Sequence, residues 1–287
     1  MATLATKALT ATLALGIGII WALPSQAQMR TSRPSVGGYS VSTPMVSESR
    51  LPPMNFIAVP RGDVIPEGRA ITSASLQYNP GAATLGTPAA GTGLGFGYSG
   101  NALSLSSQSS LGPSAQLNTG ITGYATTPWA GRIDVAGKFG LLQERAGGLF
   151  DLAGQAGAAL NVDANGTPSL GFAVGVPISK TFGLMGDSRL ALGIFPNWGT
   201  GLMAPGAIGS ELVPSTRFAL GVGGYLNLAN NIGLIADTSL ATDGAIEASN
   251  VGVDFGLSPS VTLRLSAGLP GTIGGATSYG AGLHWSY

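Results

Sequence analysis

The last eleven residues, Thr277 to Tyr287, alternate between two kinds of side chain. In an extended strand, successive side chains point to opposite faces. One face would carry Tyr279, Ala281, Leu283, Trp285 and Tyr287, and the other Ser278, Gly280, Gly282, His284 and Ser286. The first face is apolar and aromatic, and the second is small and polar. Such a strand suits a wall with hydrocarbon on one side and a wetter interior on the other.

This pattern resembles the closing strand of bacterial outer-membrane β-barrel proteins, which ends in an aromatic residue and is read by the barrel-insertion machinery. The resemblance implies that Tyr279, Leu283, Trp285 and Tyr287 form an insertion signal. It also implies two partners, the insertion machinery and outer-membrane lipid. It covers the strand pattern and the terminus, and it includes no catalytic motif.

The same alternation recurs along the chain, with turn residues roughly every eight to twelve positions, which is typical of an all-β barrel or sandwich. Twelve strands are expected, an even number as single-chain outer-membrane barrels require. Their predicted ranges are 92–99, 101–107, 115–124, 132–141, 150–162, 169–178, 188–195, 216–228, 232–240, 248–257, 261–269 and 277–287. Residues 71–78 are a further candidate, so that fourteen strands are the alternative if another lies within 83–91.

Charged residues collect on one side of this alternation. In the strand 261–269, Arg264 lies with Thr262 and Ser266, opposite a face of Val, Leu and Ala. A lipid-facing Arg or Lys at the middle of a bilayer costs ~2–4 kcal/mol, whereas an inward-facing one can be hydrated or paired. The predicted lumen-lining residues are Arg132, Asp134, Lys138, Asp151, Gln155, Arg189, Arg217, Tyr225, Asp237, Asp254, Arg264 and His284.

The composition favours a membrane barrel over an exported soluble β-sandwich, which is the alternative. Only 9% of the residues are charged, and 46 are glycine. The polar face of a soluble sandwich would normally carry many charged residues, but here it is mostly Gly, Ala, Ser and Thr. Beyond residue 27, no run approaches the roughly 18 to 20 apolar residues of a spanning helix.

The N-terminus reads as a secretory signal peptide over residues 1–27. Lys7 is followed by the apolar stretch 8–23, and cleavage is expected after Ala27. A retained single-helix anchor is the alternative. Residues 28–70 are rich in Pro, Ser and Arg, which favours a loosely ordered periplasmic extension or linker. The short apolar piece Met54 to Val59 could instead dock on a partner or plug a lumen.

Loop lengths and aromatic residues fit the same topology. The short turns near Ser258-Pro259 and at 229–231 are expected to be periplasmic, and the segments 196–215, 241–245 and 271–276 external. Most Trp and Tyr residues fall near predicted strand ends, where interfacial aromatic girdles lie.

The sequence carries little catalytic chemistry. It has no Cys and one histidine, His284, which excludes thiolate sites and a multi-histidine metal site. Ser278 and Ser286 are near His284 in sequence, but His284 is expected to face inward as an ordinary polar residue. The sequence has no basic stripe with interleaved aromatic residues, the pattern that would indicate nucleic-acid binding. We expect no enzyme activity, no cofactor and no metal.

The sequence therefore predicts an all-β transmembrane antiparallel up-and-down barrel at residues 71–287, in the outer membrane of a Gram-negative-type bacterium. Its expected function is that of a channel or transporter-like protein for small solutes. A plugged structural or surface-interaction barrel is the alternative. The solute and the oligomeric state are left open.

Overall fold

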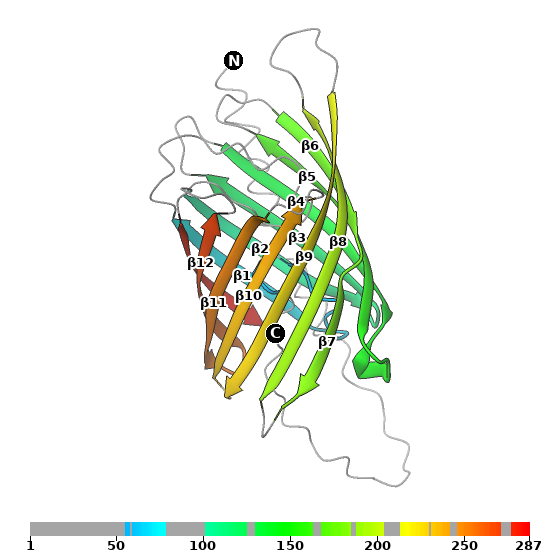
Figure 1. Ribbon diagram of the computed structural model, residues 1–287, viewed down its shortest axis with the longest axis vertical. Helices are drawn as coiled ribbons and strands as arrows, with labels where there is room; N and C mark the ends of the chain where they lie inside the picture. Colours follow the sequence, from blue (N-terminus) through cyan, green and yellow to red (C-terminus); the bar gives the residue numbers. More distant parts are fainter. Residues whose placement is uncertain are drawn as a thin grey trace.

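A computed structural model describes residues 55–57, 59–78, 101–124, 130–162, 168–184, 188–203, 213–229, 231–241, 246–270 and 277–287 (Figure 1). Its regular elements are β1 (Ala70–Tyr78), β2 (Ala102–Gly112), β3 (Ala115–Tyr124), β4 (Ala130–Leu142), the short 3₁₀ helix η1 (Glu144–Ala146), β5 (Asp151–Val162), β6 (Pro168–Gly175), β7 (Ile178–Gly183), β8 (Arg189–Met203), β9 (Val213–Ala229), β10 (Ile232–Ala241), β11 (Ile246–Ser258), β12 (Val261–Pro270) and β13 (Ser278–Ser286).

These strands form one closed antiparallel barrel of twelve strand positions. Sequential strands are hydrogen-bonded neighbours, and β1 pairs with β13 to close the wall. At that seam the backbone N–H of Ala70 donates to the carbonyl of Tyr287 over 2.8 Å, and the N–H of Tyr287 donates back to Ala70 over 3.0 Å. We call the rim where β1 begins and β13 ends the near edge, and the opposite rim the far edge.

The thirteen strand segments fill twelve positions because β6 and β7 share one. Both segments pair with β5 on one side and with β8 on the other. They are separated by Val176 and Pro177, and a proline cannot donate a hydrogen bond to a neighbouring strand. The wall stays connected there because the Val176 N–H donates to the carbonyl of Pro196, and the Pro177 carbonyl accepts from Ala153, each over 3.0 Å.

The predicted fold class and the predicted number of twelve strands are confirmed. The first strand of the barrel is β1, which corresponds to the further candidate at 71–78. The predicted strand at 92–99 lies outside the described residues, as do the signal peptide at 1–27 and residues 28–54. Among the described residues, no helix is long and apolar enough to cross a membrane.

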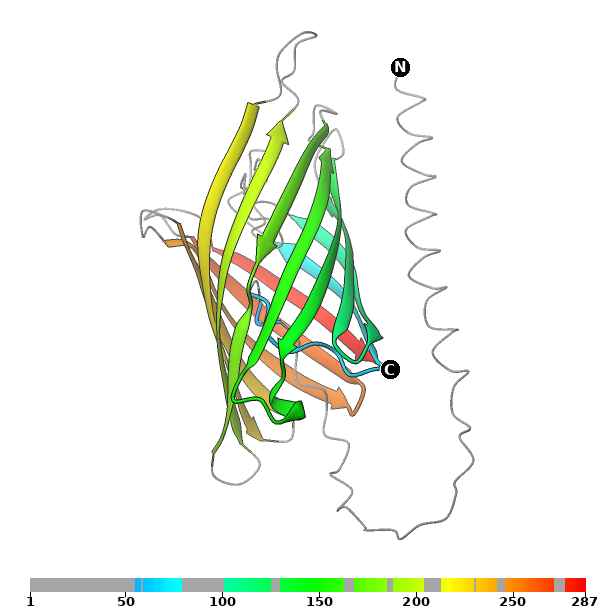
Figure 2. The ribbon, with the colours of Figure 1, turned by 90° about the vertical axis from the view of Figure 1, so that its right-hand side faces the viewer.

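The predicted external loop at 196–215 is wrong at both of its ends. Strand β8 continues through Pro196 to Met203, and β9 already begins at Val213, so that the two strands pair along 189–203 and 213–227. The paired ends of β8 and β9 project at the far edge (Figures 1 and 2). Pro196 is tolerated in a strand because it lies beside the break between β6 and β7, where its carbonyl accepts the Val176 N–H.

The wall has an apolar outer face and a polar inner face. In β12, Leu265 is 45% exposed, whereas its neighbour Arg264 is only 8% exposed. The same alternation leaves large apolar side chains exposed on most strands, among them Leu103, Val135, Phe139, Phe172, Leu192, Ile194, Phe218, Leu234, Val251 and Leu269. Exposed apolar groups in this number suit contact with hydrocarbon rather than water.

Candidate functional site: the barrel interior

A segment that precedes the barrel in the sequence runs through the barrel interior. Residues 55–57 and 59–69, called the interior segment below, contain the deeply buried side chains of Phe56, Val59, Val64 and Ile65. Figure 2 shows the trace of this segment, in blue to cyan, inside the wall. The sequence favoured a loosely ordered extension here, and for these residues the structure differs. The prolines of the segment disfavour helix and regular sheet, and Pro60 forms only an isolated β-bridge with Asn55. They do not prevent packing against a wall that supplies the missing contacts.

The wall satisfies the backbone of the interior segment with side chains. A chain without regular structure must find partners for its buried N–H groups, because each unpaired group costs about 1–3 kcal/mol. Four strand-borne or turn side chains accept these N–H groups: Asp237 Oδ2 from Val59 at 3.1 Å, Ser179 Oγ from Gly62 at 2.9 Å, Gln143 Oε1 from Val64 at 3.2 Å and Gln116 Oε1 from Ile65 at 3.0 Å. Three different regions of the wall, at β3–β4, β7 and β10, therefore hold the segment.

Glycines on β8 and β9 make room for the aromatic anchor of this segment. Gly193 and Gly223 are cross-strand partners, and the ring of Phe56 lies against both of them on the inner side of the wall. A Cβ atom at Gly193 would lie 2.7 Å from Phe56 Cε2, and one at Gly223 would lie closer still to the same ring. Only glycine fits at either position while Phe56 is in place. No local sequence pattern marks these two glycines, because the requirement comes from Phe56, more than a hundred residues away in the chain.

The anchor continues as a small apolar cluster inside an otherwise polar lumen. Phe56 and Val59 pack with Phe195 and Ile235 from the wall, and Tyr225 packs against them. A Cβ at Gly221 would lie 2.8 Å from Val59, so that this glycine also provides space for the segment. Met54 to Val59 is a short apolar piece of the Pro-rich region, and this local signal could have indicated the cluster.

The interior charges of the described residues are largely arranged in pairs. Arg264 and Asp254, cross-strand partners on β12 and β11, form two parallel hydrogen bonds, Nε to Oδ1 at 2.8 Å and Nη2 to Oδ2 at 2.9 Å. Arg264 Nη1 also donates to the carbonyl of Phe56 over 2.8 Å. On β4, Arg132 Nε lies 3.3 Å from Asp134 Oδ1. Bidentate Arg–carboxylate pairs are the stronger kind, because both oxygens are held in a fixed geometry.

A second group of charges lies near the near edge, where the interior segment leads into β1. Lys138, which is 1% exposed, donates from Nζ to the carbonyl of Asp63, and the carboxylate of Asp63 lies 3.2 Å from Arg61 Nε. Asp151 Oδ1 accepts the N–H of Glu144 over 2.7 Å, and Glu144 forms an ion pair of 2.6 Å with Lys180. The first contacts fasten the segment to β4, and the others fasten the β4–β5 connection to β5 and β7.

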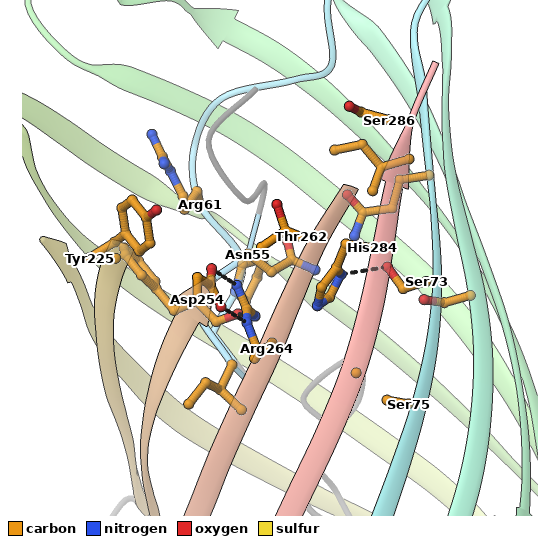
Figure 3. Close-up of a pocket in the computed structure, with 18 of the residues that line it drawn as sticks. Asn55, Arg61, Ser73, Ser75, Tyr225, Asp254, Thr262, Arg264, His284 and Ser286 are labelled. Carbon is orange, nitrogen blue, oxygen red and sulfur yellow. Dashed lines mark hydrogen bonds and ion pairs between the residues drawn. The ribbon is translucent and has the colours of Figure 1, made fainter. Parts of the chain in front are cut away.

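A cavity of about 1180 Å³ remains between the interior segment and the wall. It is lined along β13 from Ser278, at the far edge, to Ser286, at the near edge. Figure 3 shows Asn55 and Arg61 of the segment on one side of it, with Ser73, Ser75, Thr262 and His284 on strands of the wall. The interior segment therefore narrows the lumen, and the cavity borders it with lining residues on β1 to β5 and on β7 to β13.

The one histidine faces this cavity and is paired with a hydroxyl that the sequence did not single out. His284 Nδ1 lies 2.7 Å from Ser73 Oγ across the β1–β13 seam, rather than beside Ser278 or Ser286 (Figure 3). Within the part of the chain that the structure describes, the buried Nε2 atom of His284 has no hydrogen-bond partner, and no carboxylate forms a bond to this ring. A carboxylate that orients the base is part of the usual nucleophilic triad. The expectation of no enzyme activity stays a prediction.

The structure places most of the predicted lumen-lining residues inside the barrel. Buried side chains are those of Arg132, Asp134, Lys138, Asp151, Gln155, Asp237, Asp254 and Arg264. Arg189, Tyr225 and His284 line the cavity. Arg217 lies on β9, and its side chain is outside the described part of the structure. In the described ranges, no three His, Cys, Asp or Glu residues gather into a possible metal site.

The predicted insertion-signal residues lie on the other face. Tyr279, Trp285 and Tyr287 are exposed, and Leu283 is partly exposed. Tyr287 also shares a hydrogen bond of 3.1 Å, through its hydroxyl, with Thr72 on β1. The last residue of the chain therefore contributes backbone and side-chain contacts to barrel closure.

Comparison with solved structures identifies porin-type barrels as similar folds. The NanC porin aligns with a TM-score of 0.50 at 9% identity, covering 75% of this chain and 98% of that chain. The KdgM porin aligns with a TM-score of 0.47 at 8% identity, covering 76% and 99%. Omp33 of Acinetobacter baumannii aligns with a TM-score of 0.45 at 8% identity, covering 76% and 98%. No family model and no curated protein sequence matches the chain.

At such low identity, the similarity to the NanC porin shows the fold alone. The chain has the fold of a bacterial outer-membrane β-barrel, as its C-terminal strand predicted.

Proposed function

We propose that this protein is an outer-membrane channel for small solutes, narrowed by its own interior segment. The apolar outer face supports a membrane location, since large aliphatic and aromatic side chains cover the wall while charges are turned inward. The passage itself is supported by a single observation. The cavity beside the interior segment is lined from one end of β13 to the other, by Ser278 near one rim and Ser286 near the other.

The interior segment leaves part of the lumen open because its apolar anchor is seated on one part of the wall. Its apolar anchor packs on β8, β9 and β10, and its backbone bonds reach β3, β7 and β10. The lining of the cavity is densest on β1 to β3 and on β11 to β13, although every other strand except β6 also contributes to it. The segment thus acts as a constriction that sets the width of the channel, in the way that loops folded into a lumen restrict wide barrels.

A plugged barrel without transport is the second candidate, and the tight anchoring of Phe56 favours it. Current recordings in planar bilayers separate the two functions. The channel proposal expects small, stable conductance from the wild-type protein and larger conductance from the double variant Phe56→Ala/Val59→Ala, because that variant loses the apolar anchor of the segment. Heat-modifiable gel mobility of both proteins controls for folding of the barrel.

Two outcomes contradict the channel proposal. A silent wild type with a conducting double variant indicates a plug that must be displaced before anything passes. Silence from both folded proteins indicates a barrel whose role is structural or adhesive. The matched variant Gly154→Ala, whose added Cβ meets no atom within 4 Å, is expected to conduct as the wild type does.

A further inference from the structure

Small hydroxyl side chains gather on one side of the cavity, around the inward-facing residues of β13. We call this surface the hydroxyl wall, and it comprises Ser73, Ser75, Ser104, Ser106, Thr262 and Ser266. Ser73 is the cross-strand partner of Ser106, and Ser75 is the partner of Ser104, so that these four hydroxyls lie in two adjacent rows on β1 and β2. Thr262 and Ser266 extend the surface on β12, beyond β13. Hydroxyls both donate and accept hydrogen bonds.

The charged pair nearest to this surface is already neutralised. Asp254 and Arg264 are joined by two hydrogen bonds. The remaining nitrogen of the guanidinium, Nη1, donates to the Phe56 carbonyl. Separating these two side chains would leave each buried charge without its partner, which is costly. Arg61 and Asp63, on the facing interior segment, are also an ion pair. Along the hydroxyl wall, a solute therefore meets dipoles of both senses and little uncompensated charge. Arg145 and Arg189 also line the cavity, but they lie at its near-edge end.

This arrangement discriminates by the charge of the solute. An ion that enters a narrow passage gives up part of its hydration, and fixed groups of opposite charge are what normally compensate that loss. The hydroxyl wall supplies no such group. An uncharged solute that carries several hydroxyls exchanges hydrogen bonds with water for hydrogen bonds with the wall, at little net cost.

We infer that the hydroxyl wall selects uncharged, hydroxyl-bearing solutes of sugar or polyol type over ions of the same size. This inference rests on the proposed channel function and names the solute class of that channel.

The test uses three solutes of nearly equal size that differ in charge: glucose, gluconate and glucosamine. Proteoliposomes containing the full-length protein are loaded with each radiolabelled solute, and the membrane potential is held at zero with potassium and valinomycin. Efflux is then followed after dilution. Glucose is expected to leave about tenfold faster than either charged solute, which corresponds to a barrier difference of about 1.4 kcal/mol.

A charge placed on the wall gives a second readout. Ser75→Asp is expected to accelerate glucosamine efflux and slow gluconate efflux by about tenfold relative to each other. Ser188→Asp is the matched control, because Ser188 lies in the turn before β8, does not line the cavity, and bonds to the Leu228 carbonyl. It is expected to leave the three rates in their wild-type ratio.

The outcomes separate this inference from the channel proposal. Equal efflux of the three solutes from the wild type, or faster efflux of a charged one, overturns the hydroxyl-wall inference and leaves the channel in place. An unchanged ratio in Ser75→Asp overturns it as well. The absence of any efflux from folded wild-type protein, which heat-modifiable mobility confirms as folded, overturns both.

Discussion

Arg264 on β12 is bonded to Asp254 on β11 through both carboxylate oxygens, and it also holds the backbone of Phe56 in the interior segment. One guanidinium thus connects two neighbouring strands of the wall to the chain that runs through the lumen. The five donors and planar geometry of arginine allow all three bonds at once, which a lysine could not reproduce.

Arg264→Gln is expected to destabilise the folded barrel by about 3–5 kcal/mol, because it leaves the buried carboxylate of Asp254 without its counter-charge. Urea unfolding in lipid vesicles, followed by tryptophan fluorescence, measures the loss. The double variant Arg264→Gln/Asp254→Asn removes both charges, and we expect it to recover a large part of the stability. Equal stability of the single and double variants would show that the pair is not the source of the effect.

Gly223→Ala tests whether the glycines of β8 and β9 hold the aromatic anchor. The added Cβ collides with the Phe56 ring, so the ring must leave its place against β9. We expect increased single-channel conductance and faster proteolysis of the interior segment, with the barrel itself intact. Gly154→Ala is the matched control, because Gly154 on β5 has open space where the Cβ would be. Identical conductance and cleavage in the two variants would be the contradicting result.

Leu265 and Ser266 are neighbours on β12 that point to opposite faces of the wall, and they test the membrane assignment. Leu265→Arg places a charge on the lipid side and is expected to cost about 2–4 kcal/mol of stability in a bilayer if the position is near the midplane. Ser266→Arg places the same charge in the cavity, where water is available, and is expected to cost much less. Unfolding of both variants in vesicles of one lipid composition provides the comparison. Equal losses of stability would argue against a hydrocarbon environment around Leu265.

Tyr287→Ala tests the role of the terminal aromatic residue in assembly. The resemblance of the last strand to barrel-insertion signals leads us to expect slower insertion in cells and accumulation of unfolded protein in the periplasm. Tyr279→Ala removes an aromatic from the same outer face but at the far edge, and we expect a smaller effect. Pulse-labelling with heat-modifiable mobility as the readout measures both rates. A larger defect in Tyr279→Ala would contradict a signal located at the terminus.

The sequence could predict which residues face the lumen and which face outward, because this division follows from one local rule. Alternation in a strand fixes which side chains share a face, and the cost of a charge in hydrocarbon fixes which face is inside. In the structure, the side chains that follow this rule include the buried Arg132, Asp134, Lys138, Asp254 and Arg264. Eleven of the twelve strand positions, from β2 to β13, follow from the same periodicity and from turn residues, both of which are local properties.

The ends of the strands, and which segment forms the first strand, depend on pairing partners that local patterns do not identify. Pro196 looked like a loop residue because a proline interrupts most strands. It continues β8 only because the break between β6 and β7 lies beside it. Likewise, β1 is the first strand because its register matches β13, from Ile71 opposite Ser286 to Tyr78 opposite Tyr279.

Alternation and composition alone thus determined a membrane-type barrel with an ionic interior, since both depend on the residues of each strand taken separately. The tertiary structure decided what fills that interior. The seating of Phe56 against Gly193 and Gly223 joins positions far apart in the chain, and so do the pairing of His284 with Ser73 and the hydroxyl wall. Such contacts follow from the closure of the wall around the interior segment, which brings distant strands within reach of one another.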